Sequence, residues 1–173
     1  MASERPLYFM IKPPPALHPV LRGLRASHGI DEGYALDRLH STFLRLGDAA
    51  AMTAADLDTI ARAAGSLMAE PFPVVFDTLD GNLLKGGKGL REASAFQRAL
   101  ARRVTAFGFA LPPFNFWLHL SLAYTGKSER RAAIPPLGWQ VEELLLIESI
   151  KGEGRHVELG RWPLARRQFD LAL

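Results

Sequence analysis

The chain alternates short β-rich runs with amphipathic helical segments, and Gly or Pro residues separate most of them. Apolar residues at helical spacing predict helices from Pro19 to about Gly29, over residues 53–68 and over residues 94–107. Runs rich in β-branched, aromatic and other apolar residues predict strands over residues 7–12, 36–46, 72–79, 116–124 and 141–150, with a short return strand at 157–159. Strands and helices do not alternate strictly, which favours an α+β fold with antiparallel sheets.

Local signals mark several helix starts and loops. Thr53 with Asp56 and Ser94 with Gln97 each fit a capping box, so a helix is expected to begin at each pair. A turn is expected at Asp80-Gly81. The KGGKG run at 85–89 and the polar, basic segment at 125–136 are expected to be loops, and the second has the length and character of a lid.

Composition is that of an ordinary globular protein. The 173 residues are 48% hydrophobic and 23% charged, so we expect a single domain over residues 1–173, built as one unit or as two small lobes that share a core. The chain has no cysteine, which excludes disulfides and thiolate metal sites. No segment resembles a signal peptide or a membrane span, so a cytoplasmic location is expected. The net charge of +3 is compatible with a polyanionic partner but does not identify one.

Two histidines, each followed two positions later by a hydroxyl residue, are the strongest chemical signal. The first motif, LHSTFLRL, contains His40 and Thr42, and the second, WLHLSLAY, contains His119 and Ser121. Residues i and i+2 of a strand point to the same face, so each imidazole is expected beside a hydroxyl. The opposite face of the second strand is apolar and consists of Phe116, Leu118, Leu120 and Leu122. A polar pair on such a strand implies either a local partner or a function.

These side chains suit phosphate-ester chemistry. Imidazoles titrate near neutral pH, so one histidine in a cleft can act as general base while the other acts as general acid. The hydroxyls of Thr42 and Ser121 can donate hydrogen bonds to phosphate oxygens and hold the phosphorus between the two imidazoles. Such a site works by positioning and charge stabilisation, so we expect no metal ion and no other cofactor.

The paired motifs resemble those of the two-histidine phosphoesterases, and within them the 2′-5′ RNA ligase-like proteins, also called RNA 2′,3′-cyclic phosphodiesterases. The opening strand LYFMIKPP and the late strand ELLLIES resemble the same branch. The resemblance implies a bilobal α+β fold with pseudo-twofold symmetry, in which two mainly antiparallel sheets line a central cleft and helices pack outside. It further implies hydrolysis of 2′,3′-cyclic phosphates to 2′-phosphates, or reversible 2′-5′ ligation.

The resemblance also assigns roles to the motif residues. His40 and His119 become the acid–base pair, and Thr42 and Ser121 become phosphate anchors. For a 2′-phosphate product, His40 is expected to protonate the 3′ leaving oxygen and His119 to activate water. Many members of the branch have a basic residue three positions after the second hydroxyl residue, where this chain has Tyr124. The nearest cations in the following loop are Lys127, Arg130 and Arg131.

The sequence around the other aromatic, basic and histidine residues predicts which of them bind substrate, which pack in the core and which lie at the surface. Candidates for substrate binding are Tyr8, Trp117, Tyr124, Lys127 and Arg130. Phe114 and Phe116 are expected to pack in the core, and the KGGKG loop fits no phosphate-binding pattern. Surface or capping roles are expected for the histidines that lack the motif, which are His18, His28 and His156.

The paired motifs predict a metal-independent phosphodiesterase, and the resemblance implies that it acts on RNA ends or nucleotides carrying a cyclic phosphate. We expect a monomer, with neither a membrane nor an obligate protein as partner. The same cleft also suits a small nucleotide, such as a cyclic phosphate of ADP-ribose or a 2′-5′ oligoadenylate. A third interpretation is a nucleotide-binding module without turnover, although a pure binding protein has no need of two proton-transfer groups.

Overall fold

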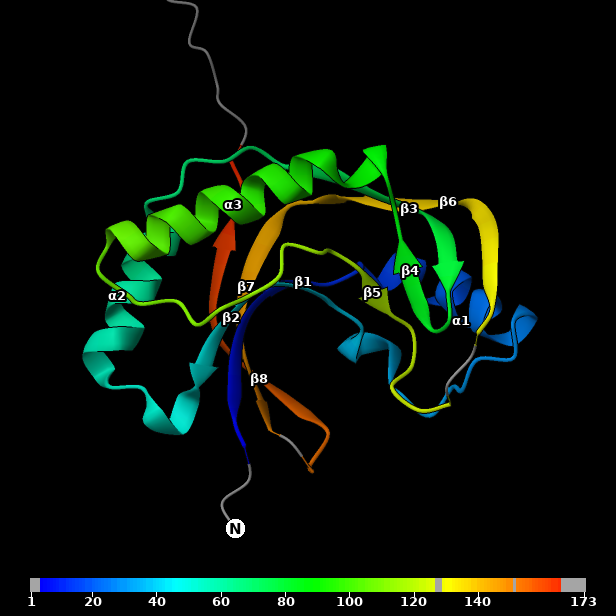
Figure 1. Ribbon diagram of the computed structural model, residues 1–173, viewed down its shortest axis with the longest axis horizontal. Helices are drawn as coiled ribbons and strands as arrows, with labels where there is room; N and C mark the ends of the chain where they lie inside the picture. Colours follow the sequence, from blue (N-terminus) through cyan, green and yellow to red (C-terminus); the bar gives the residue numbers. More distant parts are fainter. Residues whose placement is uncertain (1–3, 127–128, 151, 166–173) are drawn as a thin grey trace, which may run out of the picture.

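The computed structural model describes residues 4–126, 129–150 and 152–165, and two four-stranded antiparallel sheets form its frame (Figure 1). The first sheet has the order β2-β1-β7-β8, with β1 at Pro6–Ile11, β2 at Ser41–Asp48, β7 at Glu143–Ile150 and β8 at Arg155–Pro163. The second has the order β5-β4-β3-β6, with β3 at Phe72–Asp80, β4 at Leu83–Lys85, β5 at Leu120–Ser121 and β6 at Arg131–Val141. The predicted α+β class with antiparallel sheets is confirmed.

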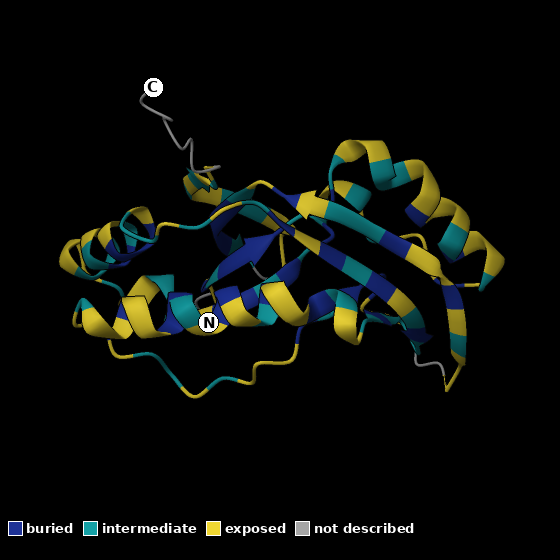
Figure 2. Ribbon diagram, turned by 90° about the horizontal axis from the view of Figure 1, so that it is seen from above, coloured by how far each residue is buried: buried dark blue, intermediate teal, exposed yellow. Residues whose placement is uncertain are grey.

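Three α-helices complete the fold of the described residues, namely α1 (His18–Ser27), α2 (Ala54–Gly65) and α3 (Arg91–Ala106). Their outward faces are exposed, whereas buried residues gather on the strands and on the inward helix faces (Figure 2). The capping box of Thr53 and Asp56 is confirmed at the start of α2. None of the helices in the described residues has the length and apolar character needed to cross a membrane.

The strand β1 shows how the first sheet separates a core face from an open face. Leu7, Phe9 and Ile11 are buried in the main hydrophobic core. Tyr8 and Met10 alternate with them and point to the other face, where they contact Leu145 and Ile147 in a small separate cluster. In the ladder with β2, Thr42 lies directly opposite Met10. The Thr42 side chain therefore belongs to the open face of this sheet.

Both strands that carry the histidine motifs are shorter than the sequence predicted. Residues 36–38 form a 3-10 turn, and β2 begins only at Ser41, opposite Ile11. Its partner β1 ends there because the prolines at 13–15 have no N–H to donate. The predicted strand at 116–124 is paired only at Leu120–Ser121, because its partner β4 has just three residues. The sequence did not predict β4, whose last residue belongs to the KGGKG run.

The predicted loop over 125–136 was too long. The strand β6 already begins at Arg131, opposite Asp80, and it contains Pro135 and Pro136. These prolines are accommodated because the pairing with β3 is irregular between Phe76 and Thr78, so ladder hydrogen bonds are not required of them. The segment between β5 and β6 is therefore shorter than the lid that the sequence suggested. The strand β7 begins at Glu143 rather than at residue 141 and ends at Ile150 as predicted. The strand β8, at Arg155–Pro163, is longer than the return strand predicted at 157–159.

The predicted capping box of Ser94 and Gln97 was wrong. The helix α3 begins at Arg91, after a 3-10 turn at Lys88–Leu90. Gln97 is buried, and its Nε2 donates a hydrogen bond of 2.6 Å to the carbonyl oxygen of Phe43. Its amide ties α3 to β2 and so fixes the strand that follows His40.

Candidate active site

His40 lies directly before β2, between the buried residues Leu39 and Ser41. Its Nδ1 is 2.8 Å from the carbonyl oxygen of Arg38. A carbonyl oxygen can only accept a hydrogen bond, so Nδ1 must be the nitrogen that carries the proton. In the neutral ring, Nε2 then has the free lone pair and is able to accept a proton.

His119 is held in the same way directly before β5. Its Nδ1 donates to the carbonyl oxygen of Trp117, 3.2 Å away, and the buried residues Leu118 and Leu120 anchor the chain on either side. As at His40, the bonded carbonyl belongs to the residue two positions earlier. Each histidine thus precedes an edge strand of its own sheet and has Nε2 available for a ligand.

One pocket of about 410 Å³ brings the two motifs together. Its lining includes both histidines together with Thr42 and Ser121. Tyr124, from the segment after β5, also lines the pocket, and the remaining lining residues come from the first sheet and the loops around it: Pro6, Tyr8, Tyr34, Arg38, Ser149, Ile150, Gly152, Gly154 and His156. Residues far apart in the sequence thus converge on one space, as the two motifs predicted.

The other candidates for substrate binding are distributed differently. Tyr8 and Tyr124 line the pocket, and the ring centroid of Tyr124 lies 6.5 Å from that of His40. Trp117 lies beside the pocket, with its ring centroid 4.8 Å from that of His119. Arg130 is exposed next to the start of β6, and Lys127 lies outside the described residues.

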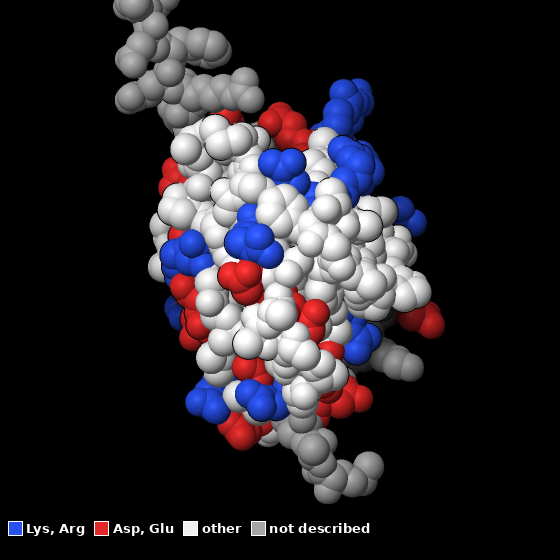
Figure 3. All heavy atoms as spheres, turned by 90° about the vertical axis from the view of Figure 1, so that its left-hand side faces the viewer, with Lys and Arg blue, Asp and Glu red and all other residues white. Residues whose placement is uncertain are grey.

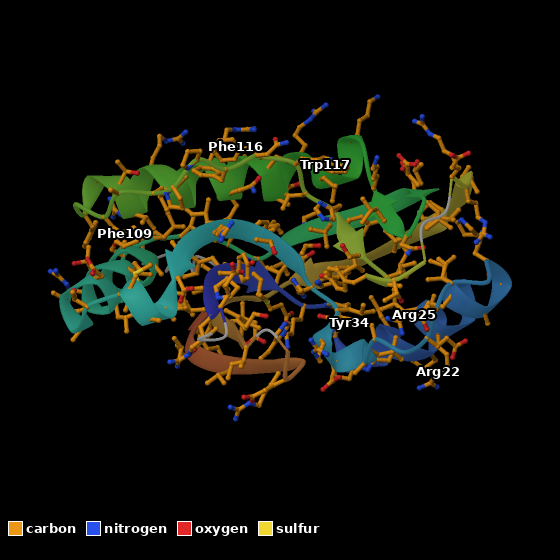
Figure 4. All side chains as sticks on the ribbon, turned by 60° about the horizontal axis from the view of Figure 1, so that its bottom comes forward. Arg22, Arg25, Tyr34, Phe109, Phe116 and Trp117 are labelled. Carbon is orange, nitrogen blue, oxygen red and sulfur yellow. The ribbon has the colours of Figure 1, made fainter. Side chains whose placement is uncertain are left out.

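The structure exposes Phe116, which the sequence placed in the core with Phe114, and also Trp117, which was a candidate for substrate binding. Phe116 is 38% exposed and Trp117 is 45% exposed. Both lie on the stretch that runs beside α3 (Figure 4). Phe114 is partly buried against the core, and its ring contacts that of Phe116. The predicted burial was therefore wrong for Phe116.

Arg38 and Tyr34 are pocket residues that sequence reasoning missed. The Arg38 guanidinium carbon lies 4.4 Å from the centroid of the Tyr34 ring, in a cation–π contact. Among the described residues, Arg38 is the only Lys or Arg in the pocket lining. Arg38 lies two positions before His40 in a 3-10 turn rather than in extended chain, so the two-residue period of a strand gave no signal for it. Tyr34 had no such signal either.

Buried Arg25 supports this part of the wall. Its Nη1 donates a 2.7 Å hydrogen bond to the carbonyl oxygen of Tyr34 (Figure 4). The Tyr34 ring in turn contacts Tyr124, with centroids 4.7 Å apart. Burial raises the pKa of Tyr34 to about 12, so its phenol stays protonated and remains a hydrogen-bond donor. The two tyrosines join the segment before His40 to the segment after His119.

His156 was expected at the surface or in a cap, and the structure corrects this. It lies on β8 and lines the pocket, with its ring centroid 5.2 Å from that of His40. Its Nδ1 is buried and has no hydrogen-bond partner among the described residues. Burial, followed by the charges of His40 and Lys12, lowers the pKa of His156 to about 3. His156 is therefore a neutral imidazole at physiological pH.

The pKa of His40 is also lowered, chiefly because burial disfavours the charged ring. The hydrogen bond to the Arg38 carbonyl acts in the opposite direction, while the positive charges of Lys12 and His119 lower the pKa further. His40 is accordingly neutral at physiological pH in the free protein. With Nδ1 protonated, its Nε2 is ready to accept a proton.

Replacing His156 with alanine is expected to shift the pH dependence of activity to higher pH. Without the ring, water reaches His40, desolvation of the imidazole weakens and its pKa rises. The pH at which His40 loses its proton therefore rises as well. The measurement is the ascending limb of kcat/KM against pH. His156→Phe keeps a ring at this position, so its shift should be smaller, and identical profiles for all three proteins would contradict this role.

The described residues contain no group of three His, Cys, Asp or Glu side chains that could hold a metal ion. The polar side chains that do converge on the pocket are imidazoles, hydroxyls, phenols and one guanidinium. This set can donate hydrogen bonds to an anion and can both accept and donate a proton. It is suited to holding a phosphate ester while a proton moves on each side of it.

Solved structures share this fold along nearly the whole chain. The structure of Escherichia coli LigT in apo form has a TM-score of 0.70 at 23% identity, over 95% of this chain and 100% of that chain. A structure described as a phosphoesterase has a TM-score of 0.71 at 23% identity, over 94% and 99% of the two chains. The protein TT0787 of Thermus thermophilus has a TM-score of 0.68 at 18% identity, over 92% and 97%.

These likenesses confirm the fold that the resemblance to the two-histidine phosphoesterases implied. Other structures of E. coli LigT with the same fold were solved in complex with 3′-AMP and with phosphate. No protein-family model matches the sequence. No curated protein matches it either.

Proposed function

We propose that this chain, which has the fold of E. coli LigT and related phosphoesterases, is a metal-independent phosphodiesterase that opens 2′,3′-cyclic phosphates of RNA to 2′-phosphates. One observation carries the proposal. Two imidazoles line one pocket, and each is fixed through Nδ1 by the carbonyl of the residue two positions earlier. This arrangement leaves two Nε2 atoms for one substrate. The complexes of LigT with 3′-AMP and phosphate support a ligand of this chemistry.

The lowered pKa of His40 supports a division of the two proton transfers in which His40 is the base. The sequence-based expectation made His40 the acid, but a ring that is neutral in the free protein is better suited to be the base. His40 Nε2 takes a proton from water as the water oxygen attacks phosphorus. The bond from phosphorus to the 3′ oxygen breaks, and His119 Nε2 gives its proton to that oxygen. Solvent then restores both protonation states.

Thr42, Ser121 and Arg38 hold the phosphate during this step. The two hydroxyls donate hydrogen bonds to its non-bridging oxygens, and the Arg38 guanidinium supplies positive charge. Arg38 thereby takes the place of the basic residue that is absent at Tyr124. Its stacking on Tyr34 restricts the guanidinium to one part of the pocket wall. A fixed donor of this kind loses less entropy when the anion binds.

The direct test is turnover in the presence of EDTA. The protein is incubated with nucleoside 2′,3′-cyclic phosphates and with an RNA oligonucleotide that ends in a cyclic phosphate, and the products are separated by chromatography. A 2′-phosphate product is expected from both. The panel includes an ADP-ribose cyclic phosphate and a 2′-5′ oligoadenylate. Turnover of only these two would assign the site to small nucleotides, and binding without any turnover would make it a nucleotide-binding module.

Ligation of an RNA 2′,3′-cyclic phosphate to the 5′-hydroxyl of a second RNA uses the same groups in the same protonation states, with the hydroxyl in place of water. His40 Nε2 takes the proton of the 5′-hydroxyl as its oxygen attacks phosphorus. The bond from phosphorus to the 3′ oxygen breaks, His119 Nε2 protonates that oxygen, and a 2′-5′ phosphodiester is left. The proposal also retains the expected single domain over residues 1–173, a monomeric state and a cytoplasmic location. Gel filtration measures the oligomeric state.

A further inference from the structure

We propose that a second nucleotide, on the 5′ side of the one that carries the cyclic phosphate, binds at a platform formed by Trp117 and Lys85. The natural substrate is then a single-stranded RNA end of at least two nucleotides rather than a mononucleotide. This inference rests on the proposed function and deepens it. The register of β4 and β5 determines which side chains lie next to His119.

The register places Lys85 on the same sheet face as the second histidine motif. Leu83 pairs with Ser121 and Leu84 with Leu120. Side chains alternate along a strand, so Lys85 shares the face of Leu83 and Ser121. The opposite face is core, since Leu84 and Leu120 are fully buried. The lysine thus belongs to the face that the pocket opens onto.

Direct contacts connect this lysine to the pocket. The Lys85 Nζ lies 4.6 Å from the centroid of the Trp117 ring. That ring is in turn 4.8 Å from the His119 ring, at an interplanar angle of 37°. Trp117 is 45% exposed, a large accessible area for an indole that contacts a candidate catalytic residue. An aromatic platform and a cation therefore continue directly from the phosphate site.

This pair of side chains suits a nucleotide. A nucleobase stacks on an indole whatever its sequence, and an ammonium group interacts with the phosphodiester beside it. Lys85 also forms an ion pair with Asp80, which holds its ammonium over the ring in the free protein. When a base stacks on Trp117, Lys85 has to move aside from the ring, and its charge then meets the incoming phosphate.

Charge argues against a route out of the site in the opposite direction. Beyond Lys12, a pocket of about 450 Å³ is lined by the carboxylates of Asp37, Glu142, Glu143 and Glu158 and by two cations, Lys12 and Arg161. Its net charge is negative, which disfavours a phosphodiester chain. The pocket of about 460 Å³ past Tyr124 is lined by Lys85 itself, together with Asp80 and Glu129. On the side of the molecule seen in Figure 3, Lys and Arg are interspersed with Asp and Glu, so no basic track is visible there.

The test compares two substrates that end in the same nucleoside 2′,3′-cyclic phosphate, one a mononucleotide and the other a trinucleotide. The quantity measured is the ratio of kcat/KM for the trinucleotide to that for the mononucleotide. Trp117→Ala should lower this ratio about tenfold, the size of one lost base–aromatic stack. Trp117→Phe keeps a ring and should retain most of the ratio. The matched control is Met68→Ala, which removes a side chain that is 80% exposed and outside the site.

The ratio separates a platform from a support for His119. If Trp117 acts only by positioning His119, both substrates lose activity equally and the ratio is unchanged, which would overturn the proposal. Binding of a fluorescent trinucleotide with a 3′-phosphate gives a second readout. If the wild-type protein turns over neither substrate, that result refutes only the proposed function. Weaker trinucleotide binding by Trp117→Ala than by the wild type would still support the platform. Equal binding by the variant and the wild type would refute the platform.

Discussion

Replacing either His40 or His119 with alanine is expected to lower kcat on a nucleoside 2′,3′-cyclic phosphate by about 10²- to 10⁴-fold. Each substitution removes one of the two proton transfers that the reaction needs. The remaining hydroxyls and Arg38 still bind the phosphate, so KM should change much less than kcat. The double variant should be little slower than either single one, since the two imidazoles act as one unit. Initial rates at saturating substrate provide the measurement.

The control for this experiment is His28→Ala. His28 lies at the end of α1, where its Nδ1 contacts the carbonyl oxygen of Leu24, and it is not part of the pocket lining. Its loss should leave kcat within about twofold, as is usual for a surface substitution away from a site. Thermal unfolding of each variant shows whether the fold is intact. Full activity in a folded His40→Ala or His119→Ala protein would contradict the assignment of that histidine.

Replacing Arg38 with methionine is expected to weaken phosphate binding about 10- to 100-fold, the size of one lost charge-assisted hydrogen bond. Methionine keeps an unbranched apolar side chain against Tyr34, so the wall should stay packed while the charge is removed. Arg38→Lys keeps the charge and should recover part of the loss, but not the planar stacking. The measurements are KM for the cyclic nucleotide and the inhibition constant of inorganic phosphate.

The same substitution should also change the pH profile in a defined direction. The positive charge of Arg38 lowers the pKa of His40, so its removal lets that pKa rise. If His40 is the base, the ascending limb of kcat/KM then moves to higher pH. Unchanged phosphate affinity in Arg38→Met would show that another cation meets the substrate.

The histidine motifs could be predicted from the sequence because their signal is local. His40 with Thr42 and His119 with Ser121 obey the two-residue period of extended chain, and their buried neighbours hold them in place. This period does not extend to Arg38, because residues 36–38 form a 3-10 turn. His156 could not be found in this way, since it reaches the pocket through the pairing of β8 with β7, where it lies opposite Ser149. Pairing between two strands produces no sequence pattern in the residues around His156 that would predict its place in the pocket.

Errors in the predicted elements have a similar origin. The apolar alternation over 116–124 is typical of a strand, but a strand also needs a partner, and β4 offers only three residues. Phe116 was placed in the core by that alternation, whereas the chain before Leu118 is unpaired and exposes it. Gln97 was assigned to a helix cap because of its spacing from Ser94. Its amide is instead used inside the protein, on the carbonyl of Phe43.

The most direct test of the acid–base pair is the pH dependence of kcat/KM for a nucleoside 2′,3′-cyclic phosphate, measured in the presence of EDTA. A bell-shaped profile is predicted, because one imidazole must be neutral and the other protonated. Burial lowers the pKa of His40, and a base with a lowered pKa becomes neutral at lower pH. The ascending limb should therefore be centred below the ordinary histidine value of 6.5. A profile without this limb, or activity abolished by EDTA, would contradict metal-independent catalysis by two histidines.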